Sequence, residues 1–376
     1  MSITERQTDN GVRVTSDAVV LFLEDVRGVD LMKKKILAIA LILVMIVSLA
    51  ACGGKTEKTD ETSENSTQSK KLVLGINDWP GSYWWLAVND LGYFKEQGVD
   101  VEVKLFSNYT DGLNALISGN VDLFVPALAD VLPGYSNGAN IKVLMVQDYS
   151  AGADGLIATS DIQSVEELKG KNIGIEFGGT DHVFLLKCLE NAGLTENDVN
   201  LVNMSTGDAA NAFMSGSLDA AAIWEPSLSQ AQKETGGNIL ATTKDKEYEG
   251  LLPAVLVANG ESLEKYRDEM KLVMKAWFNA RDAYENDFDA FAEAVSKHAE
   301  VTPEEFGTLM EGCDVRTMEE NVEAFQEGDT YVSLSYTAKM LGAFQKENGL
   351  IDTEPTDYSS LFDDTLFNEV YKELNP

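Results

Sequence analysis

An aromatic-rich segment stands directly after a short apolar run near the start of the polar part of the chain. Residues 77–85 read NDWPGSYWW, with three Trp and one Tyr in nine positions. Pro80 and Gly81 favour a turn, and a turn presents aromatic rings where they can stack on a small molecule or hold a cation. Some of these rings must also fill the space between a strand and a helix. We therefore expect Trp79 and Tyr83 to face a ligand.

A polar segment, residues 107–111, follows another β-type run and precedes a helical one. Its backbone N–H groups and the side chains of Ser107, Asn108 and Thr110 have the chemistry to hold the oxygens of a ligand. The same residue types also cap helices, and the sequence leaves both roles open.

A glycine-rich turn, residues 178–182, reads GGTDH and enters a further helix. The N–H groups of such a turn form a concave site that favours anions. We expect Thr180 and Asp181 to contact a ligand and His182 to have a structural role.

An aromatic–acid–proline turn, residues 224–226, follows another apolar strand. We expect Trp224 to cover the ligand. The sequence leaves two roles open for Glu225, which would either bind an amine or anchor a hinge.

The elements that position these segments alternate between short β-type runs and longer helical runs from residue 71 onward, which is typical of an α/β fold. Two similar units stand in tandem, because residues 111–122 read DGLNALISGNVD and residues 208–219 read DAANAFMSGSLD, identical at six of twelve positions. We expect each segment to begin with an Asp helix cap and to end with an Asp before a buried strand, in two pseudo-equivalent lobes.

The last third of the chain changes to mainly helical runs, which predicts a helical tail packed on the first lobe. We expect residues 71–157 and 252–376 to form lobe one and residues 158–251 to form lobe two, with crossings near residues 155–161 and 248–253. Open α/β sheets bind ligands beyond the carboxyl ends of their strands, so the expected cleft lies between the lobes.

A leader segment precedes this body. An apolar run of sixteen residues, 36–51, broken by Ser48 alone, follows three lysines and leads into Cys52. About 20 apolar residues are needed to span a bilayer, so this run fits a secretory signal better than a membrane span. The boundary Leu-Ala-Ala-Cys resembles a bacterial lipobox, and we expect a signal peptide over residues 32–51 with lipid attachment at Cys52.

The segments on either side of the signal are interpreted separately. Residues 1–31 have mixed character, and we expect translation to start at Met32 rather than at the first residue. Residues 52–70 are rich in Thr, Ser, Glu and Lys, which predicts a lipidated flexible tether.

Charge and cysteine content narrow the class of protein. The chain has 29 basic and 62 acidic residues, a formal net charge of −33. The electric field of this negative charge repels phosphates and anionic lipid headgroups, which argues against nucleic-acid binding and against a surface patch that binds membranes. After Cys52 the sequence contains Cys188 and Cys313, which we expect to be buried free thiols.

Four stretches together resemble a known family. They read LGYFKEQGVDVEV (residues 91–103), EELKGKNIGIEFGGTDHVFLLKCLENAGL (166–194), SGSLDAAAIWEPSL (215–228) and DYSSLFDDTLFNEVY (357–371). The pattern is similar to the nitrate, sulfonate and taurine group of ABC-importer substrate-binding proteins, over essentially all of residues 71–376.

This resemblance implies a two-lobed periplasmic-binding-protein fold of the second type. It also implies a small-molecule ligand, an ABC permease subunit in the membrane as partner, a monomer, no cofactor and no metal. With the lipobox, it places the expected body on the extracytoplasmic face of the cell membrane.

The charges of the strand-following segments bear on the ligand. These segments contain no Lys or Arg, and their acids are Asp78, Asp111, Asp130, Asp148, Glu176, Asp181, Asp208 and Glu225. A bare sulfonate or nitrate is usually held by a basic side chain, although backbone amides can serve, whereas an amine suits acids and aromatic rings. The sequence therefore favours an amine-bearing or zwitterionic ligand, although many of these acids will be helix caps.

Two other functions are compatible with the fold. A pyrimidine-forming enzyme family is similar but carries a cysteine-rich motif that this sequence lacks, and neither His182 nor His298 has metal-ligand spacing around it. We therefore expect no enzymatic activity. A ligand sensor would have the same sequence features as a transport component.

Overall fold

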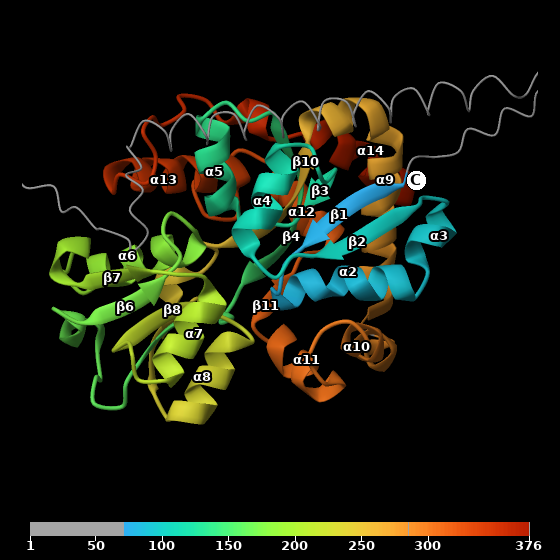
Figure 1. Cartoon of the computed structure of the whole chain (residues 1–376). Helices are drawn as coiled ribbons and strands as arrows, with labels where there is room; N and C mark the ends of the chain where they lie inside the picture. The colour runs from blue at the N-terminus through green and yellow to red at the C-terminus, as the bar shows by residue number, and fades with distance from the viewer. Residues whose placement is uncertain (1–70, 285, 376) are drawn as a thin grey trace, which may run out of the picture. The chain divides into compact units, whose positions relative to one another are not determined.

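The strands of the described chain lie in two sheets. The computed structural model describes residues 71–284 and 286–375 (Figure 1). The first sheet has the order β11-β4-β10-β3-β1-β2 and consists of β1 (Leu72–Ile76), β2 (Val101–Leu105), β3 (Leu123–Phe124), β4 (Ile141–Ser150), β10 (Pro253–Asn259) and β11 (Cys313–Val315). The second has the order β7-β6-β8-β5-β9 and consists of β5 (Asp154–Ala158), β6 (Asn172–Ile175), β7 (Asn200–Asn203), β8 (Ala220–Trp224) and β9 (Asn238–Thr242).

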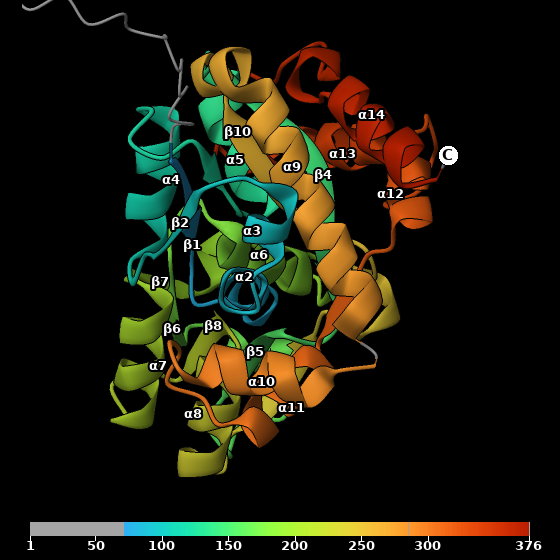
Figure 2. The ribbon, with the colours of Figure 1, turned by 90° about the vertical axis from the view of Figure 1, so that its right-hand side faces the viewer.

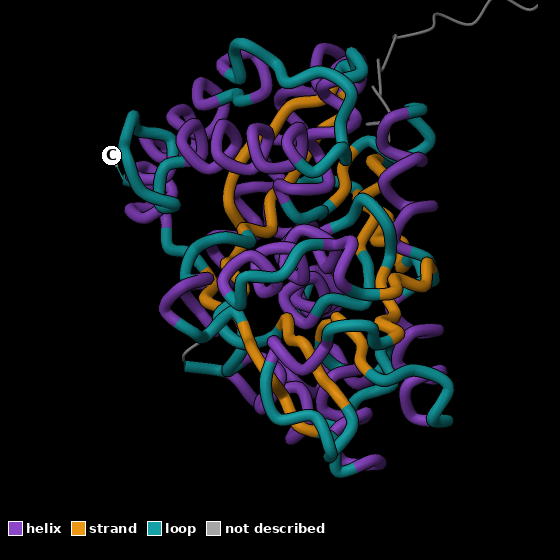
Figure 3. The backbone as a smooth tube through the Cα atoms, turned by 90° about the vertical axis from the view of Figure 1, so that its left-hand side faces the viewer, coloured by secondary structure: helices purple, strands orange, loops and turns teal. Residues whose placement is uncertain are grey.

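Helices flank the strands of both sheets (Figures 2 and 3). The described α-helices are α2 (Pro80–Asp90), α3 (Tyr93–Gln97), α4 (Tyr109–Ile117), α5 (Leu128–Ser136), α6 (Thr180–Asn191), α7 (Thr206–Met214), α8 (Ser227–Thr235), α9 (Gly260–Tyr284), α10 (Phe288–Ser296), α11 (Pro303–Met310), α12 (Met318–Ala324), α13 (Leu334–Glu347) and α14 (Asp364–Leu374). The α/β class expected from the sequence is therefore confirmed.

The same topological unit occurs once in each sheet. β1 pairs in parallel with β2 and β3, and β6 pairs in parallel with β7 and β8. The Asp that ends each repeated segment makes the same contact, since Asp122 Oδ2 accepts from the Val73 N–H at 2.9 Å and Asp219 Oδ2 accepts from the Asn172 N–H at 2.8 Å. The two segments are pseudo-equivalent, as the sequence predicted.

The helix caps of these two units differ from the expectation. Asn108 caps α4 and Ser205 caps α7, and each side chain accepts from the N–H of the Asp three residues later, Asp111 or Asp208. The cap residues have extended backbones, so each helix begins before its Asp. Both carboxylates then lie in the first turn, where the helix dipole favours negative charge.

The helical tail packs on the half of the molecule that contains the first sheet. α9 contacts α3 and α14, α10 contacts α2, and α13 contacts α5. Beneath α9, Trp277 lies among the rings of α2, with its centroid 6.1 Å from that of Trp84 and 6.3 Å from that of Trp85. The large apolar area buried there stabilises this half before any ligand binds.

Two short segments connect the sheets. The chain leaves the first sheet at residues 151–153 and returns at residues 243–252. The first crossing therefore comes before β5, rather than within residues 155–161, because those apolar residues pair with β8 in the second sheet. The Ser150 N–H donates to the Leu252 carbonyl at 3.0 Å, which holds the two segments together.

The expected leader lies outside the described residues, and this includes residues 1–31, the signal at 32–51, Cys52 and the tether at 52–70. None of the described helices has the length and apolar character to cross a membrane. Cys188 and Cys313 are both buried and free, as expected.

Candidate functional site

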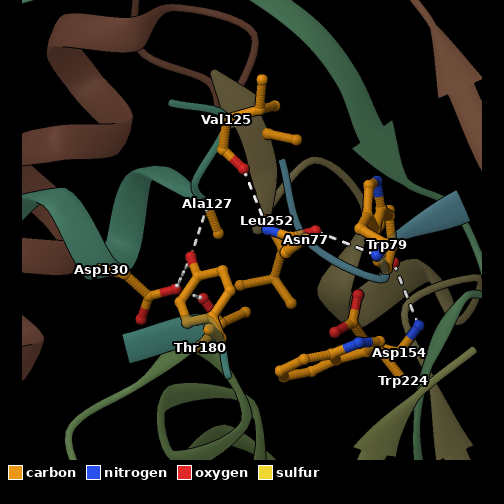
Figure 4. Close-up of a pocket in the computed structure, with 12 residues that line it drawn as sticks. Asn77, Trp79, Val125, Ala127, Asp130, Asp154, Thr180, Trp224 and Leu252 are labelled. Carbon is orange, nitrogen blue, oxygen red and sulfur yellow. Dashed lines mark hydrogen bonds between the residues drawn. The ribbon is translucent and has the colours of Figure 1, made fainter. Parts of the chain in front are cut away.

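A pocket lies where the two sheets approach each other (Figure 4). Its lining residues come from the halves of both sheets and from the second crossing: Asn77, Trp79, Tyr109, Val125, Ala127, Asp130, Ser150, Asp154, Thr180, Trp224, Leu252 and Ala254. Several of them directly follow parallel strands, which is where the sequence predicted a cleft.

Trp79 is held at the pocket edge from both ends. Its backbone N–H donates to Asn77 Oδ1 at 2.9 Å, and the Asn77 amide in turn donates to the Val125 carbonyl at 3.1 Å. Its indole Nε1 donates to Asp148 Oδ1 at 3.0 Å. The ring is therefore oriented by its own hydrogen bonds before any ligand enters.

A cluster of three polar side chains joins the two sheets across the pocket. Tyr109 donates its hydroxyl hydrogen to Asp130 Oδ2 at 2.5 Å and accepts from the Ala127 N–H at 3.0 Å. Thr180, the first residue of α6, donates to the same Asp130 oxygen. Burial raises the pKa of Asp130 to about 6, although the hydrogen bonds from Thr180 and Tyr109 oppose this shift.

Asp154 lies on the opposite wall, and its carboxylate points into the pocket (Figure 4). The residue is 2% exposed. Burial raises the pKa of this carboxyl to about 7; the Ser150 hydroxyl opposes the shift, and the nearby charges of Asp130, Asp148 and Glu225 add to it. Its backbone N–H donates to Ser150 Oγ at 3.2 Å, which fixes the start of β5 against the end of β4.

Trp224 ends β8 and lies beside Asp154, its register partner in β5. Its ring centroid is 5.8 Å from that of Tyr109, so the two rings meet across the sheets. The pocket thus combines three aromatic rings, two buried carboxylates and several neutral hydrogen-bonding groups. Among its described lining residues there is no Lys, Arg or His.

The comparison with protein families agrees with this architecture. The NMT1/THI5-like family matches the chain over residues 82–287, more than half of its length. The chain belongs to the NMT1/THI5-like family. The matched residues include most of the segments that form the pocket.

Individual proteins are also similar to this chain in sequence or in structure. The taurine-binding periplasmic protein of Escherichia coli is 25% identical over 289 residues, which cover 73% of this chain and 86% of that protein. The structure of the alkanesulfonate-binding protein SsuA from Xanthomonas axonopodis pv. citri, bound to MOPS, superposes with a TM-score of 0.66 at 17% identity and covers 77% of this chain and 97% of its own. This NMT1/THI5-like chain therefore has the two-lobed periplasmic-binding-protein fold.

The same fold also occurs in an enzyme. The structure of the desulfurization enzyme DSZB superposes with a TM-score of 0.60 at 15% identity and covers 81% of this chain and all of its own. Membership of the fold alone does not distinguish binding from catalysis. Among the described residues of the present chain, no group of three or more His, Cys, Asp or Glu side chains is arranged to hold a metal ion.

Three of the residues singled out in the sequence line the pocket, namely Trp79, Thr180 and Trp224. Tyr83 does not, because the segment expected to be a turn is the first part of α2, with Pro80 as its first residue. Proline suits this position, since its ring already has a helical φ and its missing N–H would have no helical partner there. The ring of Tyr83 is 5% exposed and packs in the core, and burial raises the pKa of its hydroxyl.

The polar segment before α4 places one residue in the pocket, Tyr109, which was not among the expected site residues. Asn108 caps α4 and is exposed, as is Ser107, and neither lines the pocket. Thr110 instead donates to Glu176, in the segment that follows β6 of the second sheet. Tyr109, between them, is the residue of this segment that reaches the pocket.

Asp181 and Glu225 hold helices and do not line the pocket. Asp181 is buried and accepts from Thr206 Oγ1 at 3.0 Å, which ties α6 to the first residue of α7. Glu225 accepts from the Ser229 N–H at 3.0 Å and from its hydroxyl at 2.6 Å, so it caps α8. Capping uses the same carboxylate chemistry as ligand binding, and the sequence alone cannot separate the two.

His182 has the structural position that the sequence predicted. Its Nδ1 accepts from the Gly178 N–H at 3.1 Å, and its ring stacks on Phe177 with centroids 5.3 Å apart. Burial lowers the pKa of His182 to about 4, so the ring is neutral at physiological pH.

Proposed function

We propose that this NMT1/THI5-like protein is the extracytoplasmic solute-binding lipoprotein of an ABC importer. It captures a small organic solute, sulfonate- or taurine-like or amine-bearing, between its two lobes and delivers it to a membrane permease. The observation that carries this proposal is the pocket itself, because both sheets contribute side chains to it. The names of the taurine- and alkanesulfonate-binding relatives support it.

Binding at such a pocket is coupled to the relative position of the lobes. A ligand that touches Trp79 on one side and Trp224 on the other gains both contacts only when the lobes are closed. It therefore shifts the population toward the closed form by its difference in affinity for the two forms. A permease that contacts both lobes would then distinguish loaded from empty protein. The proposed moving bodies are the two lobes expected at residues 71–157 with 252–376 and at residues 158–251, with their first boundary moved to residues 151–153 because β5 pairs within the second sheet.

Membrane attachment is the second part of the proposal. The signal over residues 32–51 would be removed and Cys52 lipidated, with residues 53–70 as the tether. Mass spectrometry of the mature N-terminus should find a lipid-modified Cys52, and Cys52→Ala should move the protein from the membrane fraction to the soluble fraction. A mature chain that keeps residues before Cys52 would contradict this part without affecting the pocket.

Ligand screening tests the binding function. Residues 68–376 form one compact unit, so residues 53–376 are suited to purification. Thermal unfolding is followed with taurine, alkanesulfonates, nitrate, bicarbonate and aminopyrimidines, because a ligand at 100 times its Kd adds about 2.7 kcal/mol to stability. At least one solute should raise Tm, and Trp79→Ala and Trp224→Ala should each abolish that rise.

Matched controls separate binding from general effects. Phe177→Ala removes an aromatic ring that is 47% exposed and does not line the pocket, so it should leave the rise in Tm unchanged. The same incubations are analysed by mass spectrometry for chemical conversion. A solute that is consumed by the protein would replace transport with catalysis as the function of this fold.

A further inference from the structure

Every ionisable side chain that lines the pocket is an acid. Asp130 and Asp154 line it from the first and second sheets, and the described lining contains no basic residue. Two further acids lie next to the lining: Asp148 accepts from the indole of Trp79, and Asp78 is placed beside the indole of Trp224. The electrostatic potential in this space is therefore negative.

The two lining carboxylates differ in what they already bind. Asp130 accepts hydrogen bonds from Tyr109 and Thr180, so it is used in joining the sheets. Asp154 has the Ser150 hydroxyl beside it, and its carboxylate faces the empty space (Figure 4). A carboxylate removed from water without a counter-charge is costly, and burial accordingly raises the pKa of Asp154 to about 7.

The rings around Asp154 suit a positive charge as well. Trp79, Tyr109 and Trp224 line the same space, and the Tyr109 and Trp224 planes are inclined by 59°. Aromatic faces attract cations, most strongly where water is excluded. A sulfonate or nitrate in the same place would meet ring faces and carboxylates, both of which repel it.

We propose that the pocket selects a small organic cation, whose ammonium group binds the Asp154 carboxylate while its body lies between the rings of Trp79 and Trp224. The proposal rests on the proposed binding function and names its ligand class. A sulfonate group on the ligand is dispensable, and an anion without an amine is excluded. Asp154 is the specificity-determining residue, and the ammonium–carboxylate hydrogen bond is charge-assisted.

Four small compounds test the two charges separately. Ethanolamine carries the ammonium alone, isethionate the sulfonate alone, taurine both and ethylene glycol neither. Isothermal titration of residues 53–376 should show binding by ethanolamine and taurine and none by isethionate or ethylene glycol. Larger pairs that differ in the same way, butylamine against butanesulfonate and benzylamine against phenylmethanesulfonate, repeat the test for a ligand that fills more of the pocket.

The Asp154→Asn variant tests whether the Asp154 carboxylate binds the ammonium group of the ligand. Asn keeps the shape and removes the charge, so binding of the amines should weaken by about 10- to 100-fold, the range for a hydrogen bond between charged groups. Asp208→Asn makes the same chemical change at the exposed start of α7 and should alter binding by less than about twofold. If Asp154→Asn does not fold, the compound pairs on the unaltered protein still decide the question.

The possible outcomes are distinct. Binding of the sulfonates without the amines, or full amine binding by Asp154→Asn, overturns the proposal and leaves the solute-binding function intact. Failure of every compound in both charged series, together with failure of the wider screen, overturns the binding function and the proposal together.

Discussion

Thr180 donates its hydroxyl hydrogen to Asp130, and this hydrogen bond joins α6 of the second sheet's half to α5 of the first sheet's half. A second bond, from Thr110 to Glu176, joins the same two halves nearer the surface. Both contacts exist only while the sheets are close together. They therefore favour the closed arrangement and would break when the pocket opens.

Thr180→Val should weaken ligand binding by making closure less favourable. Valine keeps the size of threonine but cannot donate to Asp130, and losing one partner of a buried carboxylate costs about 1–3 kcal/mol. We expect the Kd for the ligand found by screening to rise by roughly 5- to 150-fold. Titration calorimetry and urea unfolding measure the two effects separately.

Thr206→Val provides the matched control. Thr206 also donates a hydrogen bond to a buried carboxylate, that of Asp181, but both residues belong to the second sheet's half. This variant should lose about as much unfolding free energy as Thr180→Val does, while its Kd for the ligand changes by less than about twofold. Equal effects of the two variants on Kd would show that the Thr180 bond has no special part in closure.

Gly81→Ala should disturb the position of Trp79 through Asp148. A Cβ built on Gly81 would lie 2.0 Å from Asp148 Oδ2, and the same carboxylate accepts from the Trp79 indole. Asp148 is also held by the Gln147 amide at 2.7 Å, so it cannot simply turn away. We expect a loss of about 1–3 kcal/mol in unfolding free energy and weaker ligand binding.

Gly207→Ala is the control for this substitution. Gly207 lies in the first turn of α7 with open space around its Cβ position, so the same change should be neutral or slightly stabilising. Wild-type stability and binding in Gly81→Ala would mean that Asp148 moves freely and does not fix the ring of Trp79.

Part of the pocket lining was predictable from sequence because open α/β sheets bind ligands beyond the carboxyl ends of their parallel strands. Asn77, Trp79, Val125 and Thr180 come after parallel strands, which is where the sequence predicts a cleft. Asp154 was missed because β5 runs antiparallel to β8, so its first residue, not its last, lies beside Trp224. Strand direction is set by pairing between distant segments, which no local pattern records.

Asp130 was missed for a different reason. It was noted among the acids of the strand-following segments, but no role was predicted for it, and the structure places it in the first turn of α5, a helix that contains Pro133. Proline in the middle of a short helix lowers its apparent propensity, and tertiary packing overrides this. The short strands β9 and β11 pair with β5 and β4, which are distant in sequence, so local patterns do not reveal them.

Stability should increase as the pH falls from 8 to 5. Burial raises the pKa of Asp148 and of Asp154 to about 7, and that of Asp130 to about 6, from 3.8. The folded protein therefore keeps protons that the unfolded chain has released. These bound protons make their whole contribution to the unfolding free energy below about pH 4, and that contribution is lost as the pH rises through 7. The gain is on the order of 2 kcal/mol per group, measured by urea unfolding at constant ionic strength.

The Asp148→Asn variant should be at least as stable as the parent at pH 8 and less stable than the parent at pH 5. Asn carries no charge, so at pH 8 the variant should equal or exceed the parent in unfolding free energy. At pH 5 the parent gains its proton and the variant does not, so the variant should be less stable by about 1 kcal/mol or more. A pH dependence identical to that of the parent would mean that Asp148 is ionised throughout and that other groups cause the slope.

The two cysteines should be unreactive in the folded protein and reactive in the unfolded one. Burial raises the pKa of Cys188 to about 12 and that of Cys313 well above its ordinary value, so almost no thiolate is present at pH 8. The thiolate is the form that attacks a disulfide reagent, and both side chains are also shielded from it. Residues 53–376, which lack Cys52, should release no colour with Ellman's reagent until denatured, and then two equivalents. Rapid labelling of the native protein would place a cysteine at an accessible surface, and fewer than two equivalents after denaturation would mean that Cys188 and Cys313 form a disulfide that the present structure excludes.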